Sequence, residues 1–315
     1  MNTSSVINPR TCWINARFSR LTSWLPSHYL AISLVVLGLI ANITVCFVLL
    51  RGGRFKKHLS NFMLFHLSIT GIAYRLIVVP SQWAALFYPF RAKPTTLCKV
   101  AKTVRYTFNT AVFTSLVIIA FDRHQSITRP FQRLKHKPKF YRYLLAVWGY
   151  SLLCAAPQMY NAGTLVLNYT SSYSATNVTV AFHHCSVPSI KGFTSSTVAT
   201  IIYYILGFLV PLVVLIIAYS NIYVSLRRKR RNPVINQAAL KSTGKALRVL
   251  VLVVLGFVVC LGVPQLCDLM RSFVSKGKAE IVFLSFILEM SSFIINPIIY
   301  GFYSADFNQG LKCRR

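Results

Sequence analysis

Acidic residues are nearly absent from this sequence. Only 5 of its 315 residues are Asp or Glu, against 35 Lys and Arg, which gives a formal net charge of +30. Charged residues of both signs make up 13% of the chain, whereas a soluble globular domain carries about 25%. So little charge cannot cover the surface of a water-soluble enzyme. So basic a balance indicates binding either to nucleic acid or to an anionic membrane face.

Patterns that carry chemistry are missing as well. The sequence contains no nucleophile beside a general base, no phosphate-binding loop and no metal-ligand spacing among its eight cysteines and seven histidines. We therefore predict that the protein is not an enzyme and that it uses neither a cofactor nor a metal ion.

Long apolar runs are what the sequence has instead, since 55% of its residues are hydrophobic. A membrane helix needs about 20 apolar residues. Seven segments meet this need, so we predict an all-α membrane protein with seven spans and no nucleic-acid partner. The segments are 29–50, 59–83, 97–121, 142–162, 196–226, 246–270 and 280–303. The first 28 residues lack the apolar core of a signal peptide, so the first span is expected to direct insertion.

The basic residues predict the orientation of these spans. Segments 51–58, 123–142, 227–248 and 304–315 hold 4, 7, 8 and 3 of the 35 Lys and Arg residues. Because basic residues accumulate on the cytoplasmic side, the N-terminus is expected outside. Glycosylation sequons at Asn2, Asn168 and Asn177 fall on the predicted outer side, although one at Asn42 lies inside the first span.

Short motifs occur in several of these spans, in a consistent order. They are Gly38-x-x-Ala41-Asn42-x-x-Val45, Asp122-Arg123-His124, Trp148, Pro211 with Tyr219, and Asn296-Pro297-Ile298-Ile299-Tyr300. Together they resemble the motifs of the rhodopsin-like G-protein-coupled receptors over essentially the whole chain. The subfamily is not settled, although the second outer loop is similar to that of peptide receptors.

The resemblance implies roles for several residues. The activation switch would comprise Asp122, Arg123, Tyr219, Asn296, Pro297 and Tyr300. Cys98 and Cys185 would form the disulfide of the outer face. The domains would be an extracellular N-terminus (1–28), the seven-span receptor domain (29–303), and a short amphipathic eighth helix with a cytoplasmic tail (304–315). Cys313 in that tail is either palmitoylated or a free thiol.

The sequence also departs from the family pattern at two interior positions. Gly71 stands where the family usually has a sodium-binding Asp, and Gly262 stands where it usually has a Trp. A pocket without its carboxylate is not expected to hold sodium. These departures leave open whether the receptor is basally active, silent or deficient in signalling.

Ionisable residues inside the predicted spans indicate the ligand site. Arg75, Arg105 and Glu289 lie well within the bundle, where a charge is costly and marks a functional candidate. Arg105 occupies the position of the Asp that binds amines in amine receptors, so monoamine ligands are improbable. An Arg105–Glu289 salt bridge, with Arg75 snorkelling to the interface, is the structural alternative and is compatible with a ligand role. The predicted ligand-binding residues are Gln82, Lys102, Arg105, Asn109, Gln265 and Glu289.

The outer loop 163–194 contains two β-prone runs, 164–167 and 178–182, which predict a hairpin. We therefore predict a plasma-membrane receptor that binds an extracellular peptide ligand and activates heterotrimeric G proteins. A receptor for an anionic nucleotide or lipid, a seven-span transporter and a receptor-like protein without signalling are the alternatives. The basic run 227–231 is expected to meet anionic membrane lipids or to help seat the G protein.

Overall fold

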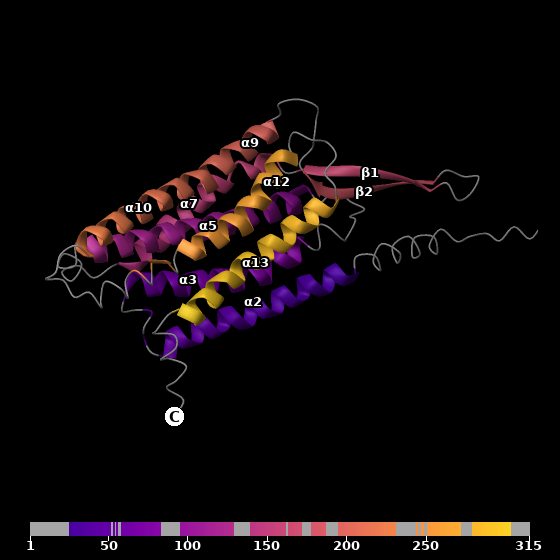
Figure 1. Cartoon of the computed structure of the whole chain (residues 1–315). Helices are drawn as coiled ribbons and strands as arrows, with labels where there is room; N and C mark the ends of the chain where they lie inside the picture. Colours follow the sequence, from indigo (N-terminus) through magenta and orange to yellow (C-terminus); the bar gives the residue numbers. More distant parts are fainter. Residues whose placement is uncertain are drawn as a thin grey trace, which may run out of the picture.

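The protein is nearly all helical in this computed structural model. The structure describes residues 25–51, 53, 55, 58–82, 95–128, 139–161, 163–171, 178–186, 195–230, 244, 247–248, 251–271 and 279–303. Its helices run side by side as an elongated bundle (Figure 1). A single two-stranded hairpin is the exception within the described residues, and it lies at one end of the bundle.

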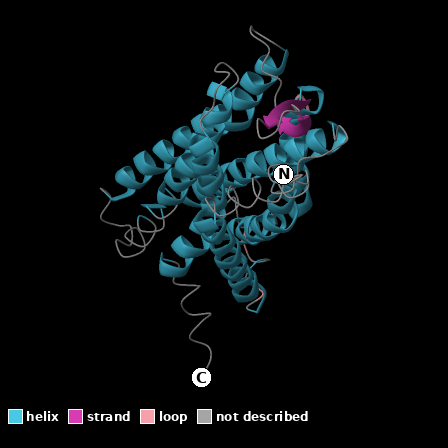
Figure 2. Cartoon of the chain, turned by 90° about the vertical axis from the view of Figure 1, so that its right-hand side faces the viewer, coloured by secondary structure: helices cyan, strands magenta, loops and turns pink. Residues whose placement is uncertain are grey.

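Helices occur in all seven of the predicted ranges. They are α2 (Leu25–Arg51), α3 (Leu59–Ala73) with η2 (Tyr74–Val78), α5 (Thr95–Thr128), α7 (Phe140–Ala155) with α8 (Gln158–Asn161), α9 (Ser195–Tyr203) with η3 (Tyr204–Leu209) and α10 (Val210–Arg230), η4 (Val258–Gly262) with α12 (Val263–Arg271), and α13 (Ala279–Tyr303). The view in Figure 2, turned by 90°, shows the same packing of helix on helix.

Five of these helical stretches are long and apolar enough to cross a membrane. They are Tyr29–Arg51, Leu59–Gln82, Thr96–Thr128, Thr197–Arg230 and Val251–Met270. The fourth predicted span is broken at Ala156 and Pro157, where proline cannot donate to the helix ladder, and α7 itself has 16 residues. In the seventh, the apolar stretch within α13 is Leu284–Ile295. The multi-pass prediction is therefore confirmed for the bundle, with two spans of shorter apolar length.

The bundle is apolar on the outside and partly polar within. Leu76 is 62% exposed, whereas its neighbour Arg75 is 2% exposed, and large aliphatic side chains are exposed along many of the helices. In water such a surface would aggregate, whereas lipid is a suitable solvent for it. The interior polar groups must therefore find partners on neighbouring helices.

Pro297 illustrates how one such group is paired. Proline lacks an N–H, so the carbonyl of Phe293 four residues earlier has no partner within α13. Asn42 on α2 donates its Nδ2 to this carbonyl at 2.9 Å, and also to the Gly38 carbonyl at 2.7 Å. Asn42 thus joins the first span to the seventh and supplies the donor that Pro297 lacks.

Three π-helical turns, η2, η3 and η4, interrupt the helices around the middle of the bundle. Such turns insert a residue and re-aim the side chains near it. A Cβ at Gly262 would lie 2.5 Å from the Phe208 ring of η3. The buried Phe208 ring therefore lies against Gly262, the position where the family usually has a Trp. The same ring packs edge-on against Phe113, with 5.1 Å between the ring centroids.

The hairpin predicted for the outer loop is confirmed. Strands β1 (Gly163–Ser171) and β2 (Val178–Ser186) pair antiparallel, with Thr164 opposite Cys185. Both strands contact α5, and Figure 1 shows the hairpin projecting away from the bundle end. Cys98 of α5 is disulfide-bonded. The side chain of Cys185 lies outside the described residues, so its pairing with Cys98 stays a prediction.

Helices α3, α5 and α7 are joined by a histidine. Trp148 donates its Nε1 proton to Nε2 of His66 at 3.0 Å, and Ser115 contacts Nδ1 at 3.2 Å. Tryptophan can only donate, so Nε2 of His66 must be the unprotonated nitrogen and the ring is neutral. Ser115 Oγ also donates to the Ala111 carbonyl, which leaves its oxygen free to accept from Nδ1–H.

We expect His66→Leu to destabilise the bundle because it leaves the Trp148 N–H without an acceptor, at a cost of about 1–3 kcal/mol. His66→Gln is the matched control, since its Oε1 can accept at the place of Nε2. Thermal unfolding of the detergent-solubilised protein measures the difference. A melting temperature of the Leu variant equal to that of the Gln variant would contradict this assignment.

Candidate functional site

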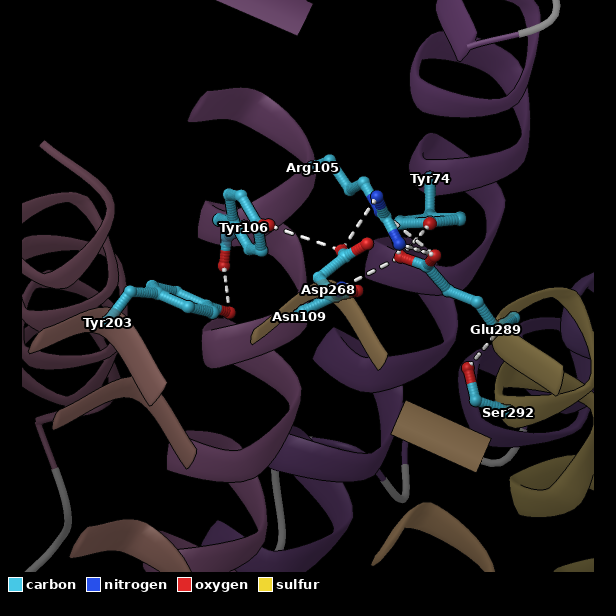
Figure 3. A network of polar contacts seen from close by, with 8 residues as sticks. All are labelled: Tyr74, Arg105, Tyr106, Asn109, Tyr203, Asp268, Glu289 and Ser292. Carbon is cyan, nitrogen blue, oxygen red and sulfur yellow. Dashed lines mark hydrogen bonds and ion pairs between the residues drawn. The ribbon is translucent and has the colours of Figure 1, made fainter. Parts of the chain in front are cut away.

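Arg105 and Glu289 form the centre of a polar network between helices. Nε of Arg105 on α5 donates to both Glu289 carboxylate oxygens at 2.9 Å, and Nη2 lies 2.6 Å from Oε2 (Figure 3). Glu289 on α13 is fully buried. The salt bridge expected from the sequence is thereby confirmed, and it joins the third and seventh spans.

Glu289 has further donors around it. The Tyr74 hydroxyl of η2 donates to Oε1 at 2.5 Å, and Asn109 donates its Nδ2 to the same oxygen at 2.8 Å. Arg105 and Asn109 lie one turn apart on α5, so both reach the same carboxylate. The guanidinium of Arg105 compensates the charge of this buried carboxylate, and Tyr74 and Asn109 supply it with further hydrogen bonds.

Asp268 is a site residue that the sequence reasoning missed. Its Oδ2 lies 3.3 Å from Nη1 of Arg105, and it accepts a hydrogen bond from the Tyr106 hydroxyl at 3.2 Å. Figure 3 shows Asp268 of α12 beside Arg105, next to Glu289. The sequence could have indicated Asp268, because it is one of only five acidic residues and lies three positions from Gln265, a predicted ligand-binding residue. The network thus joins the third, sixth and seventh spans.

A second aromatic group extends the network toward α9. The Tyr203 hydroxyl donates to the Tyr106 backbone carbonyl at 3.1 Å, and the two rings lie 4.2 Å apart. Lys102 lies one turn outward of Tyr106, with Nζ 5.7 Å from the ring centroid. Lys102 and Arg105 are both half-buried, as expected of residues nearer the mouth of the site.

Arg75 does not snorkel to the membrane interface, contrary to one alternative from the sequence. It donates from Nη1 to the Gly71 carbonyl at 3.1 Å and from Nη2 to the Met290 carbonyl at 3.2 Å. A Cβ at Gly38 would lie 2.0 Å from this guanidinium, so the glycine of α2 makes room for it. Arg75 therefore connects α2, η2 and α13 from the interior.

The other predicted ligand residues lie at the same end. Gln82 is half-buried at the end of the second span, and Gln265 is buried on α12, one turn inward of Asp268. The structure thus brings Arg105, Asn109 and Glu289 into direct contact, with Lys102 and Gln265 on adjacent turns. In the described part of the chain, Nε2 of Gln82 has no hydrogen-bond partner, so Gln82 is not joined to these residues through that atom.

The predicted switch residues lie near the opposite end. Asp122 accepts hydrogen bonds from both the backbone N–H (3.1 Å) and the hydroxyl of Ser60 on α3. Tyr219 and Pro297 are buried in α10 and α13.

Several predictions fall where the structure gives no side chain. At Asn296, Tyr300 and Asn168 the structure describes the backbone of the helix or strand but not the side chain. Asn2, Asn177, Cys313 and the expected eighth helix lie outside the described residues altogether.

Comparison with known proteins identifies the bundle. The family model described as "7 transmembrane receptor (rhodopsin family)" matches residues 41–300. The chain is 22% identical to neuropeptide Y receptor type 1 of Xenopus laevis over 89% of this chain and 78% of that protein. It is 28% identical to somatostatin receptor type 4 of Rattus norvegicus (88% and 69%) and 24% identical to the substance-K receptor of Mus musculus (93% and 75%).

The pairing at the centre of the site predicts a double-mutant result. Arg105→Ala and Glu289→Ala should each lower surface expression, because removing one partner of a buried pair costs about 3–5 kcal/mol. The double variant should recover only part of the loss, since neither charge of this pair is then left alone but Asp268 still loses Arg105 as its cation. Flow cytometry of tagged protein on intact cells measures this. Single variants that reach the surface like the parent would show that the two charges do not depend on each other.

Proposed function

The chain belongs to the rhodopsin family of seven-transmembrane receptors, and we propose that it is a plasma-membrane receptor for an extracellular peptide that signals through heterotrimeric G proteins. The relatives that carry the peptide proposal are receptors named for neuropeptide Y, somatostatin, substance K and galanin. Their similarity extends over 88–93% of this chain, so it includes the whole bundle and not one motif.

The ligand site that we propose is the outer half of the bundle, next to the β1–β2 hairpin. The observation that carries it is the network of Arg105, Asp268 and Glu289, which places three ionisable side chains inside a membrane bundle. Such groups are costly in lipid and mark functional sites. Because they come from α5, α12 and α13, a ligand bound among them contacts three helices at once.

Signal transfer would follow from movement of those helices. Two packings of one bundle can differ by only a few kcal/mol, so a ligand that binds one packing better shifts the population toward it. Near the inner end, Asp122 accepts two hydrogen bonds from Ser60, and its neighbour Arg123 would be the cation that meets a cytosolic partner. Pro297 gives α13 a point at which it lacks one internal hydrogen bond.

The orientation and lipid contacts are part of the same proposal. With the N-terminus outside, Arg227, Arg228, Lys229 and Arg230 in the last turn of α10 lie at the cytoplasmic face. Lys229 donates to the Ile127 carbonyl of α5, so this basic turn also fixes the inner end of the third span. The other basic residues can meet anionic lipid head groups, at about 1 kcal/mol each.

Family membership decides between the classes considered from the sequence. The family comprises receptors rather than enzymes or transporters, as predicted. The anionic nucleotide or lipid ligand loses its main support, because the guanidinium of Arg105 is already engaged by two carboxylates. The experiment below tests the remaining hypothesis, a receptor-like protein without signalling.

We expect cells that express the receptor to activate G proteins in response to a peptide from a panel that includes neuropeptide Y, somatostatin, substance K and galanin. Arg123→Ala should abolish the response at unchanged surface level. Lys102→Ala should raise the half-maximal concentration of the peptide about tenfold. It should not lower expression, because Lys102 is only half-buried and lies nearer water. A bioluminescent G-protein dissociation assay measures both.

A response that persists in Arg123→Ala would contradict the proposed coupling. Absence of both basal and peptide-induced activation in the parent would favour the receptor-like protein without signalling.

A further inference from the structure

We propose that the innermost part of the ligand site is a subsite for a neutral primary carboxamide, and that Gln265 and Asn109 are its recognition residues. This inference rests on the proposed function, since it assumes that a ligand enters the outer half of the bundle. It concerns which chemical group of the ligand reaches deepest.

The charges of the site are not free to bind a charged ligand group. Arg105 contacts Glu289 through Nε and Nη2 and Asp268 through Nη1, and Glu289 also accepts from Tyr74 and Asn109. An incoming carboxylate or ammonium would have to separate a buried, hydrogen-bonded pair, which is strongly unfavourable. Lys102, Arg105, Asp268 and Glu289 have a formal sum of zero, so these four side chains together favour neither sign of ligand charge.

Gln265 is buried without any hydrogen-bond partner among the described residues. Its side chain is 3% exposed, and neither Oε1 nor Nε2 is paired. A buried amide in this state loses the hydrogen bonds that water would provide. Because buried polar groups in proteins are almost always hydrogen-bonded, the unpaired Oε1 and Nε2 of Gln265 indicate that a hydrogen-bonding ligand group belongs beside them.

Asn109 contributes a further acceptor. It is 1% exposed, and its Nδ2 donates to the Glu289 carboxylate. Since a carboxylate only accepts, this bond fixes which atom of the amide is nitrogen and leaves Oδ1 as the unpaired oxygen.

Helix geometry places these two residues at one depth. Asn109 lies one turn inward of Arg105 on α5, and Gln265 lies one turn inward of Asp268 on α12. Arg105 and Asp268 are in contact, so the next turns inward on the same two helices both lie beneath this ion pair. A ligand that passes the ion pair therefore reaches Asn109 and Gln265 next.

The unpaired atoms match a primary carboxamide in number and kind. Asn109 Oδ1 and Gln265 Oε1 are two acceptors, and Gln265 Nε2 is a donor. A primary carboxamide offers two N–H donors and one carbonyl acceptor, as at an amidated peptide C-terminus or an Asn or Gln side chain. A backbone amide offers one donor, a carboxylate offers none, and an ammonium has no acceptor for Nε2.

Three isosteric probes test the subsite without a known ligand. Propionamide, propionate and propylammonium, each at tens of millimolar, are added to purified receptor, and the melting temperature is recorded. We expect propionamide to raise it more than the other two, because a group that binds only the folded state stabilises that state. The shift should vanish in Gln265→Leu, which has a similar volume and no polar atom.

The stability of Gln265→Leu without any probe separates recognition from structure. Because the amide of Gln265 is unpaired, Gln265→Leu should unfold at the same or a higher temperature than the parent. A lower temperature would show that the side chain is bonded in the empty receptor, for example to water, and would overturn the proposal. Equal shifts from all three probes, no shift, or a larger shift from propionate or propylammonium would do the same.

A peptide arm distinguishes this inference from the proposed function. For any peptide that activates the receptor, its carboxamide and carboxylate forms are compared at the group that enters the bundle. The carboxamide should be at least about tenfold more potent on the parent, and the preference should disappear in Gln265→Leu. Activation with equal potency of both forms would leave the peptide receptor standing and refute the carboxamide subsite.

Discussion

Compensation of the buried Glu289 charge is the constraint on which the outer half of the bundle depends. A carboxylate with no exposed surface, inside a bundle whose outer face is aliphatic, is tolerated only with a cation and further donors. Arg105, Tyr74 and Asn109 satisfy it from two other helices, and Arg105 in turn engages Asp268. The positions of the second, third and seventh spans are therefore linked through Glu289, and Arg105 extends the link to Asp268 of the sixth.

Close approach between helices is obtained elsewhere by pairing a glycine with a large side chain. Arg75 occupies the space at Gly38, and Phe208 occupies the space at Gly262. A methyl group at either glycine would overlap the neighbouring side chain. The departure at Gly262 is thus compensated locally by a ring from the fifth span, which packs on Phe113 of the third. The interior is filled although the family's Trp is absent.

Charged and neutral side chains have different roles in the ligand site. The ionic residues bond mainly to one another and determine how α5, α12 and α13 meet. The neutral amides of Gln265 and Asn109 retain unpaired atoms one turn deeper. A receptor built in this way can recognise a neutral group in a site lined by charges, because the charges are already neutralised within the protein.

Long apolar runs determined the seven helices, because about 20 apolar residues are needed to cross a membrane, and the β-prone runs determined the hairpin. The sequence also predicted the Arg105–Glu289 pair, since two lone opposite charges in a membrane interior must meet. It could not place Asp268, Tyr74 or the carbonyl partners of Arg75 and Asn42, because these contacts depend on how each helix is rotated and packed against its neighbours. Only the tertiary structure decided which polar atoms were satisfied and which, at Gln265, were left for a ligand, since pairing is a property of the packed bundle and not of any one helix.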